Sequence, residues 1–189
     1  MRRPLAALLI ATAIAACSAP GGAHGPTTAG PSGAGASSSV STSTTDGPFR
    51  LEIVMPKASW TTGEVITGSS TLSIADASAA TVSGSGGGVT AFSYDQVDGP
   101  HHTGYGQTSD CVGYPISPTA PITQPLSKSG GFGAEDPDVD FMRSFLLNPE
   151  IHLPPGTWDV TAIAMFVAAP MCGGDQHEMR ATVRITVTG

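Results

Sequence analysis

The sequence predicts an all-β protein, an antiparallel β-sandwich that follows a signal segment and a disordered linker. First, the chain of 189 residues contains 24 glycines and 16 prolines, which cost roughly 1 and 3 kcal/mol at helix-interior positions. Second, apolar and polar residues alternate with a period of two from residue 48 onward, a pattern typical of half-buried strands between turns. The length suits one domain of ordinary size.

The alternation locates the strands in order along the chain. It begins at residues 49–55, where Phe, Leu, Ile and Met occupy every second position. Further strands are expected near residues 66–74 and 89–97, and the clearest two apolar rows lie at residues 158–166 and 179–187. Only residues 139–147, which are bounded by prolines, are expected to form a short helix.

Charge narrows the range of partners. Eight Lys and Arg residues oppose fifteen Asp and Glu residues, for a formal net charge of -7. Nucleic-acid binding depends on basic side chains that neutralise phosphates. We therefore expect no nucleic-acid partner.

The first 17 residues have the pattern of a secretory signal. Arg2 and Arg3 precede an apolar run that is too short to span a membrane as a helix. Residues 14–17, Ile-Ala-Ala-Cys, resemble the lipobox of bacterial lipoproteins. The resemblance implies removal of residues 1–16 and attachment of diacylglycerol to Cys17, usually with a fatty acid such as palmitate. An ordinary secretory signal is the alternative.

Residues 17–47 are predicted to be the lipidated cysteine and a flexible linker, and residues 48–189 the folded domain. Of the thirty residues from 18 to 47, twenty-seven are Gly, Ser, Thr, Pro or Ala, a composition with too little apolar surface for a core. We expect the domain to be held by Cys17 on the extracytoplasmic face of the cell membrane. In a bacterium with two membranes, the outer membrane is the alternative location.

A short motif before the penultimate strand indicates the type of sandwich. Residues 153–158, Leu-Pro-Pro-Gly-Thr-Trp, resemble the Leu-x-x-Gly-x-Tyr corner of immunoglobulin-like domains. Trp158 replaces the Tyr, so an indole N–H stands where a hydroxyl usually bonds back to the chain. The resemblance implies an immunoglobulin-like sandwich. The order of segments is also similar to the bacterial intracellular proteinase inhibitor family, although no inhibitory loop is recognisable.

The cysteine count predicts one disulfide. If Cys17 carries lipid, Cys111 and Cys172 remain as an even pair in an extracytoplasmic protein, where disulfides form and persist. Two free or metal-bound thiols are the alternative.

Copper binding or delivery is the alternative function. The candidate ligands are thioether and imidazole donors: His177, Met179, Met171, His101 and His102. Copper sites use such donors, but Met179 follows His177 too closely for a cupredoxin-like loop, and Cys172 cannot serve both as a thiolate ligand and in a disulfide. Packing in the core is the competing explanation for the methionines.

The acidic run at residues 135–140 is a weaker candidate, for Ca²⁺. An EF-hand would require Gly and Glu where Phe141 and Leu147 stand. A solvated loop is therefore expected.

The sequence predicts a binding module that is not an enzyme. No nucleophile elbow, metalloprotease motif or phosphate-binding loop is present. Loops at residues 98–114, 127–140 and 170–176 are expected to contact an envelope protein or an extracellular ligand, because binding residues often lie on loops. The first candidates for contact are His101, Tyr105, Tyr114 and Phe132. A structural protein without a discrete ligand is a third possibility, and no cofactor is expected apart from copper in the alternative.

Overall fold

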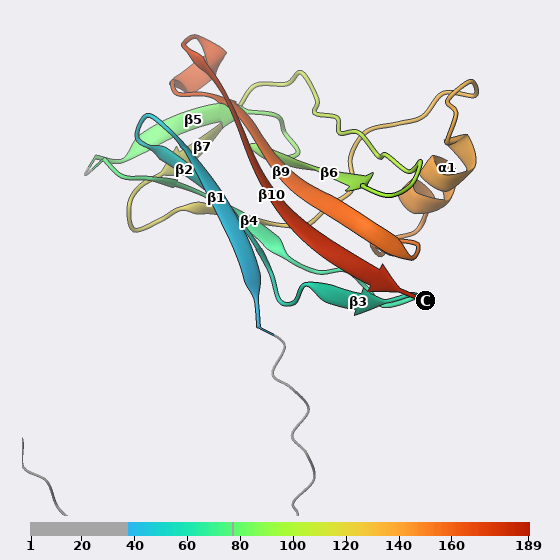
Figure 1. Ribbon diagram of the computed structural model, residues 1–189. Helices are drawn as coiled ribbons and strands as arrows, with labels where there is room; N and C mark the ends of the chain where they lie inside the picture. Colours follow the sequence, from blue (N-terminus) through green and yellow to red (C-terminus); the bar gives the residue numbers. More distant parts are fainter. Residues whose placement is uncertain (1–37, 77) are drawn as a thin grey trace, which may run out of the picture. The chain divides into compact units, whose positions relative to one another are not determined.

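The protein is described by a computed structural model that covers residues 38–76 and 78–189. Within these residues the chain forms ten strands in two sheets, one α-helix and one short 3₁₀ helix, which confirms the predicted all-β class (Figure 1). The predicted signal, Cys17 and most of the predicted linker lie outside the described residues. None of the helices described here is long and apolar enough to cross a membrane.

The smaller sheet has four strands, and all neighbours in it are antiparallel. Their order is β1 (Val40–Asp46), β2 (Phe49–Met55), β4 (Ser69–Ile74) and β8 (Ile122–Pro125). In β2 every second residue is buried, from Phe49 to Met55, because successive side chains of a strand point to opposite faces.

The larger sheet is built around a long antiparallel hairpin of β9 (Gly156–Val167) and β10 (Gln176–Thr188). Residues 158–164 of β9 also pair with β6 (Thr90–Gln96), and the last residue of β9 pairs with β5 (Ala80–Gly84). β5 in turn pairs with β7 (Val112–Ile116). On the far side of the hairpin, β3 (Ser59–Thr61) runs parallel to the end of β10. The 3₁₀ helix η1 (Pro170–Cys172) connects β9 to β10.

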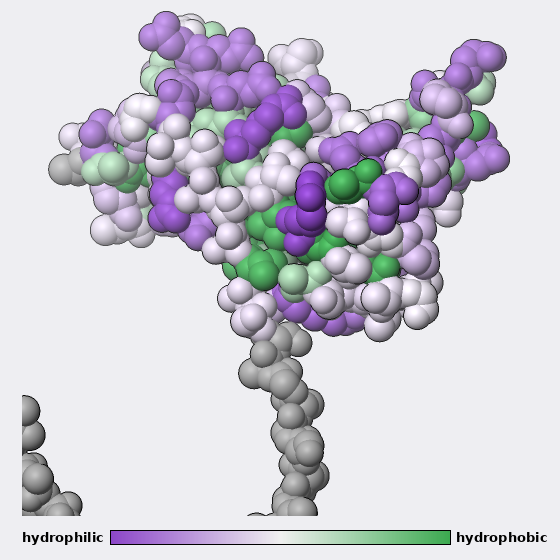
Figure 2. Space-filling model, viewed as in Figure 1, coloured by the Kyte–Doolittle hydropathy of each residue, from purple (hydrophilic) through white to green (hydrophobic). Residues whose placement is uncertain are grey.

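The core lies between the two sheets. The two predicted apolar rows of the hairpin are buried throughout: Trp158, Val160, Ala162, Ala164, Phe166, Met179, Ala181, Val183, Ile185 and Val187. Figure 2 shows hydrophobic side chains between β1 and β10, where the sheets meet, and hydrophilic side chains over much of the rest of this face.

The folded part begins earlier than the predicted boundary at residue 48. β1 starts at Val40 and pairs along its whole length with β2. Its sequence, Val-Ser-Thr-Ser-Thr-Thr-Asp, has no apolar row, and its residues are exposed or half-buried. An edge strand of this kind is held by main-chain hydrogen bonds, so hydrophobic alternation does not reveal it.

The predicted helix is present with the predicted bounds. α1 (Val139–Leu147) lies in the long connection between β8 and β9 and buries Met142 and Phe145. The main-chain N–H of Met142 bonds to the oxygen of Asp138 at 3.0 Å, and that of Asn148 bonds to Ser144 at 3.3 Å. The short strands β3, β5, β7 and β8 were not predicted individually, because each has too few residues to establish a period.

Candidate functional site

Two of the three loops expected to bind a partner meet beside α1. His101 Nδ1 lies 2.8 Å from Asp138 Oδ2, and the main-chain N–H of Gly106 donates to Ser129 Oγ at 3.3 Å. The third loop, around η1, follows the end of β9, whereas the last residues of β6 pair with its start. The loop at residues 98–114 reaches both places, because Cys111 near its end is bonded to Cys172 in the third loop.

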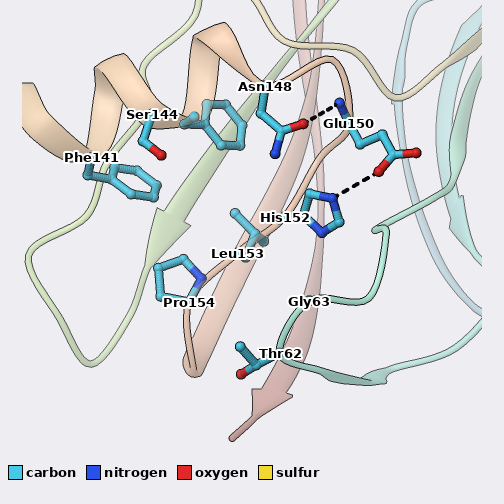
Figure 3. A pocket seen from close by; sticks show the side chains of 10 residues that line it. Thr62, Gly63, Phe141, Ser144, Asn148, Glu150, His152, Leu153 and Pro154 are labelled. Atoms are coloured by element: carbon cyan, nitrogen blue, oxygen red, sulfur yellow. Dashed lines mark hydrogen bonds and ion pairs between the residues drawn. The ribbon is translucent and has the colours of Figure 1, made fainter.

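A pocket of about 310 Å³ opens next to α1. Its lining residues come from α1, from the segment that leads into β9, and from the turn after β3: Phe141, Ser144, Phe145, Asn148, Glu150, His152, Leu153, Pro154, Thr62 and Gly63. In Figure 3, Phe141 and Ser144 project from α1 above Leu153 and Pro154, and Glu150 and His152 lie on the other side. Residues 62–63 and residues 141–154, which are far apart in sequence, thus enclose one space.

The apolar wall of the pocket is part of the core. Phe145 and Leu153 are buried, and Phe141 packs against the core from a half-buried position. The Phe141 ring stacks on His101 with a centroid separation of 4.3 Å, which also links the wall to the loop at residues 98–106. Because these contacts belong to a close-packed interior, this wall is preformed.

Hydrogen bonds orient the polar wall. His152 Nδ1 lies 3.2 Å from the main-chain oxygen of Glu64, and its Nε2 lies 3.1 Å from Glu150 Oε2. Asn148 Oδ1 accepts a bond of 2.9 Å from the main-chain N–H of Glu150. Because that N–H can only donate, the amide orientation is determined, and among the described residues Asn148 Nδ2 is left as the free donor.

The pocket contains a serine, a histidine and a glutamate, the residue types of a hydrolase triad. A triad requires the imidazole to bond to the acid through one nitrogen and to the serine through the other. Both nitrogens of His152 already face other acceptors, Glu150 and the main chain of Glu64. The arrangement gives Ser144 no base, and it is suited to holding a ligand by hydrogen bonds.

The predicted contact residues are distributed over different parts of the surface. Phe132 is exposed, and the Arg143 guanidinium lies 5.6 Å from the centre of its ring, so this residue stands near α1. Tyr105 lies against β10, where its hydroxyl accepts a bond of 2.9 Å from Arg180. Tyr114 is half-buried and donates its hydroxyl to the main-chain oxygen of Ser85 at 2.6 Å. Of the four, His101 and Phe132 adjoin the helix.

The predicted copper ligands occupy different surroundings. Met171 is 88% exposed, whereas Met179 is buried in the core. His177 Nδ1 pairs with Asp46 Oδ2 at 2.6 Å, His101 pairs with Asp138, and His102 pairs with Asp95. Across residues 38–76 and 78–189, no group of three or more His, Cys, Asp or Glu side chains is placed to hold a metal. Met179 thus packs in the core as the competing explanation expected, whereas Met171 does not, and no observation on the described residues favours copper at either.

The predicted disulfide is present. Cys111 and Cys172 are bonded, with their Cα atoms 6.1 Å apart. The bond joins the end of the loop at residues 98–111 to η1, and both cysteines are exposed. No thiolate is therefore available at Cys172 for a metal.

The polar residues of the pocket, Asn148, Glu150 and His152, were not among the predicted sites. A weak signal exists in residues 150–153, Glu-Ile-His-Leu, where Ile151 and Leu153 are buried while Glu150 is exposed and His152 half-buried. Alternation predicts that Glu150 and His152 share a face. It does not predict that α1 and the turn at residues 62–63 lie opposite them.

The chain was also compared with known proteins. Neither a family model, nor a curated protein, nor a solved structure matches it.

Proposed function

We propose that this chain is a lipid-anchored, extracytoplasmic lipoprotein whose immunoglobulin-like sandwich is a binding module. Its ligand site is the pocket beside α1. The observation that carries the binding role is the pocket itself, because a preformed apolar wall there faces a set of oriented polar groups. Concave sites that combine an apolar lining with a few fixed polar groups are typical of ligand binding.

Two features support the extracytoplasmic location. The Ile-Ala-Ala-Cys sequence at residues 14–17 follows a short apolar run, and Cys111 and Cys172 form a disulfide. Disulfides are retained mainly in oxidising compartments. A cysteine modified with two or more acyl chains has enough buried hydrocarbon for stable membrane anchoring.

The strand arrangement supports the immunoglobulin-like assignment. β6, β9 and β10 are adjacent in one sheet, as strands C, F and G are in such domains, whereas β2, β4 and β8 are adjacent in the other. At the corner that leads into β9, Trp158 Nε1 donates to the main-chain oxygen of Pro154 at 3.0 Å. The indole thus bonds back to the chain four residues upstream, a role that the Tyr hydroxyl has in immunoglobulin-like corners.

The hydrogen bonds of His152 support a role in binding without catalysis. Each ring nitrogen of His152 faces an oxygen acceptor, either Glu150 or the main chain of Glu64, so neither nitrogen faces Ser144 to take its proton. The pocket therefore offers donors and acceptors to a ligand but lacks an activated nucleophile.

The anchor can be tested by labelling. The full chain and its Cys17→Ala variant would be produced in bacteria grown with radioactive palmitate. We expect label and membrane association in the unmodified chain and loss of both in the variant. Equal labelling of the two proteins, or no labelling of either, would contradict lipidation at Cys17.

The binding role can be tested on intact cells. The full chain would be crosslinked to its surroundings in three forms: unmodified, Asn148→Ala, and Asp76→Ala as a control at an exposed residue outside the expected contact loops. We expect Asn148→Ala to lose a crosslinked species that Asp76→Ala retains. If both variants retain every species found with the unmodified chain, the pocket is not the binding site.

A further inference from the structure

We propose that the pocket beside α1 binds one ring of a neutral saccharide, an inference that rests on the proposed function and specifies its ligand. The inference depends on four properties of the pocket: its size, its charge, the contrast between its two walls, and its carboxyl group. The first three properties each exclude a class of ligand, and the fourth excludes cleavage of the ligand.

The size of the pocket limits the ligand to about one ring. Its volume of about 310 Å³ lies at the lower end of the range for small-molecule sites, roughly 300–1,000 Å³. Thr62, Ser144, Asn148 and Glu150 are exposed, so the pocket is open to solvent at its rim. A longer chain could enter with its terminal unit and extend outward.

The charges in the pocket favour a neutral ligand. Glu150 and His152 supply the charged or ionisable side chains among its described lining residues, and they pair with each other at 3.1 Å. No Lys or Arg of the described residues lines the pocket to hold a phosphate or carboxylate, and the ammonium of nearby Lys128 is bonded to main-chain oxygens. The carboxylate that could attract a cation, that of Glu150, is already bonded to the His152 imidazole. The pocket therefore does not favour a cation either.

The two walls favour a ligand with one apolar face and a polar edge. Phe141, Leu153 and Pro154 present carbon surface, whereas Ser144 and Asn148 present polar groups. Within the described part of the chain, Ser144 Oγ and Asn148 Nδ2 have no hydrogen-bond partner. A wholly apolar ligand would bury these groups unpaired, which is unfavourable. A sugar ring has C–H groups on its faces and hydroxyls around its edge, so it satisfies both walls.

The pocket is expected to bind a saccharide without cleaving it. Glycoside hydrolysis usually requires two carboxyl groups on opposite sides of the scissile bond. Glu150 is the one carboxyl group among the described residues that line this pocket. The reaction therefore lacks its second carboxyl group here.

Saturation-transfer NMR of the full chain, in a zwitterionic detergent free of sugar, would test the proposal. The probes would be neutral hexoses and N-acetylhexosamines, with a hexuronic acid, a hexose phosphate and phenylalanine amide for comparison. We expect signals from one or more neutral sugars, with dissociation constants of about millimolar for a single ring. Asn148→Ala and Phe141→Leu should each weaken binding about tenfold, because each removes one principal contact. Asp140→Ala, whose side chain is 93% exposed, should leave binding unchanged.

Three results would overturn the saccharide assignment. Binding of the charged sugars or of phenylalanine amide in preference to neutral sugars would show that the pocket binds another class, and the proposed function would stand. Sugar binding that Asn148→Ala and Phe141→Leu do not weaken would place the sugar elsewhere. If no probe binds, the saccharide assignment fails, and the crosslinking experiment separately decides whether the pocket binds any partner.

Discussion

Lys128 Nζ donates a hydrogen bond to the main-chain oxygen of Phe145 over a distance of 2.6 Å. The same ammonium group also bonds to the main-chain oxygens of Asn148 and Glu150, and it lies 4.9 Å from the centre of the Phe145 ring. The last carbonyl groups of a helix have no partner within the helix. One lysine from the segment after β8 thus holds the end of α1 and the polar wall of the pocket against the sandwich.

Replacing this lysine should destabilise the protein. Lys128→Met keeps most of the aliphatic stem but leaves three carbonyl groups without their charged donor. We expect the free energy of unfolding to fall by about 2 kcal/mol, the magnitude of a charge-assisted hydrogen bond. Urea denaturation of the full chain would measure the change. Arg143→Met, which removes a positive charge from the exposed face of α1, should change the midpoint little. Equal midpoints for the two variants would show that Lys128 does not brace the helix.

The corner at Trp158 can be tested with a matched pair of variants. Trp158 is fully buried, so Trp158→Phe and Trp158→Tyr both leave a void, and each should cost about 3 kcal/mol from lost volume. Only Tyr can donate a hydrogen bond to the oxygen of Pro154. We therefore expect Trp158→Tyr to be more stable than Trp158→Phe by about 1 kcal/mol, measured from denaturant midpoints. Equal stability of the pair would mean that the hydroxyl does not replace the indole N–H.

The disulfide should contribute strongly to stability. Cys111 and Cys172 are 61 positions apart, and closing a loop of this length stabilises a protein by about 4 kcal/mol on the chain-entropy model. The double variant Cys111→Ser/Cys172→Ser should unfold at lower denaturant concentration. A reducing agent should shift the unmodified chain to the same midpoint and leave the double variant unchanged. An unchanged midpoint in the double variant would show that the folded loops hold this region without the bond.

Glu64 should make stability depend on pH. A hydrogen bond from the Lys57 ammonium, followed by one from the main-chain N–H of Thr61, holds the pKa of Glu64 below its usual value. A carboxyl group with a lowered folded-state pKa stabilises the protein above its unfolded pKa of about 4.3, and this contribution is lost as pH falls through the folded pKa. The melting temperature of Glu64→Gln should therefore lie below that of the unmodified chain at pH 7, and the difference should narrow as pH falls below the unfolded pKa and close below the folded pKa.

A control for this experiment is Glu135→Gln, which changes the charge equally at an exposed loop residue. This variant should melt close to the unmodified chain at pH 7, because a solvated carboxylate contributes little to stability. A difference for Glu64→Gln that persists undiminished at low pH would point to a cause other than ionisation of this carboxyl group.

The sequence by itself determined the elements whose signals are local. The apolar rows of β2, β9 and β10 appear as strict alternation, since every second side chain must enter the core. The bounds of α1 follow from the prolines on either side of it and from the amphipathic residues between them. The partner of Cys111 follows from counting, because Cys172 is the remaining cysteine once Cys17 is assigned to lipid.

Only the tertiary structure decided where β1 begins and which residues form the pocket. β1 is held by main-chain bonds to β2 and has no apolar row, so its Ser and Thr residues resemble a linker in sequence. The pocket depends on α1, residues 148–154 and the turn at residues 62–63 coming together. This arrangement follows from strand pairing between distant segments, such as β3 with the end of β10. Pairing between distant strands is selected by the packing of the whole core, and no short stretch of sequence encodes it.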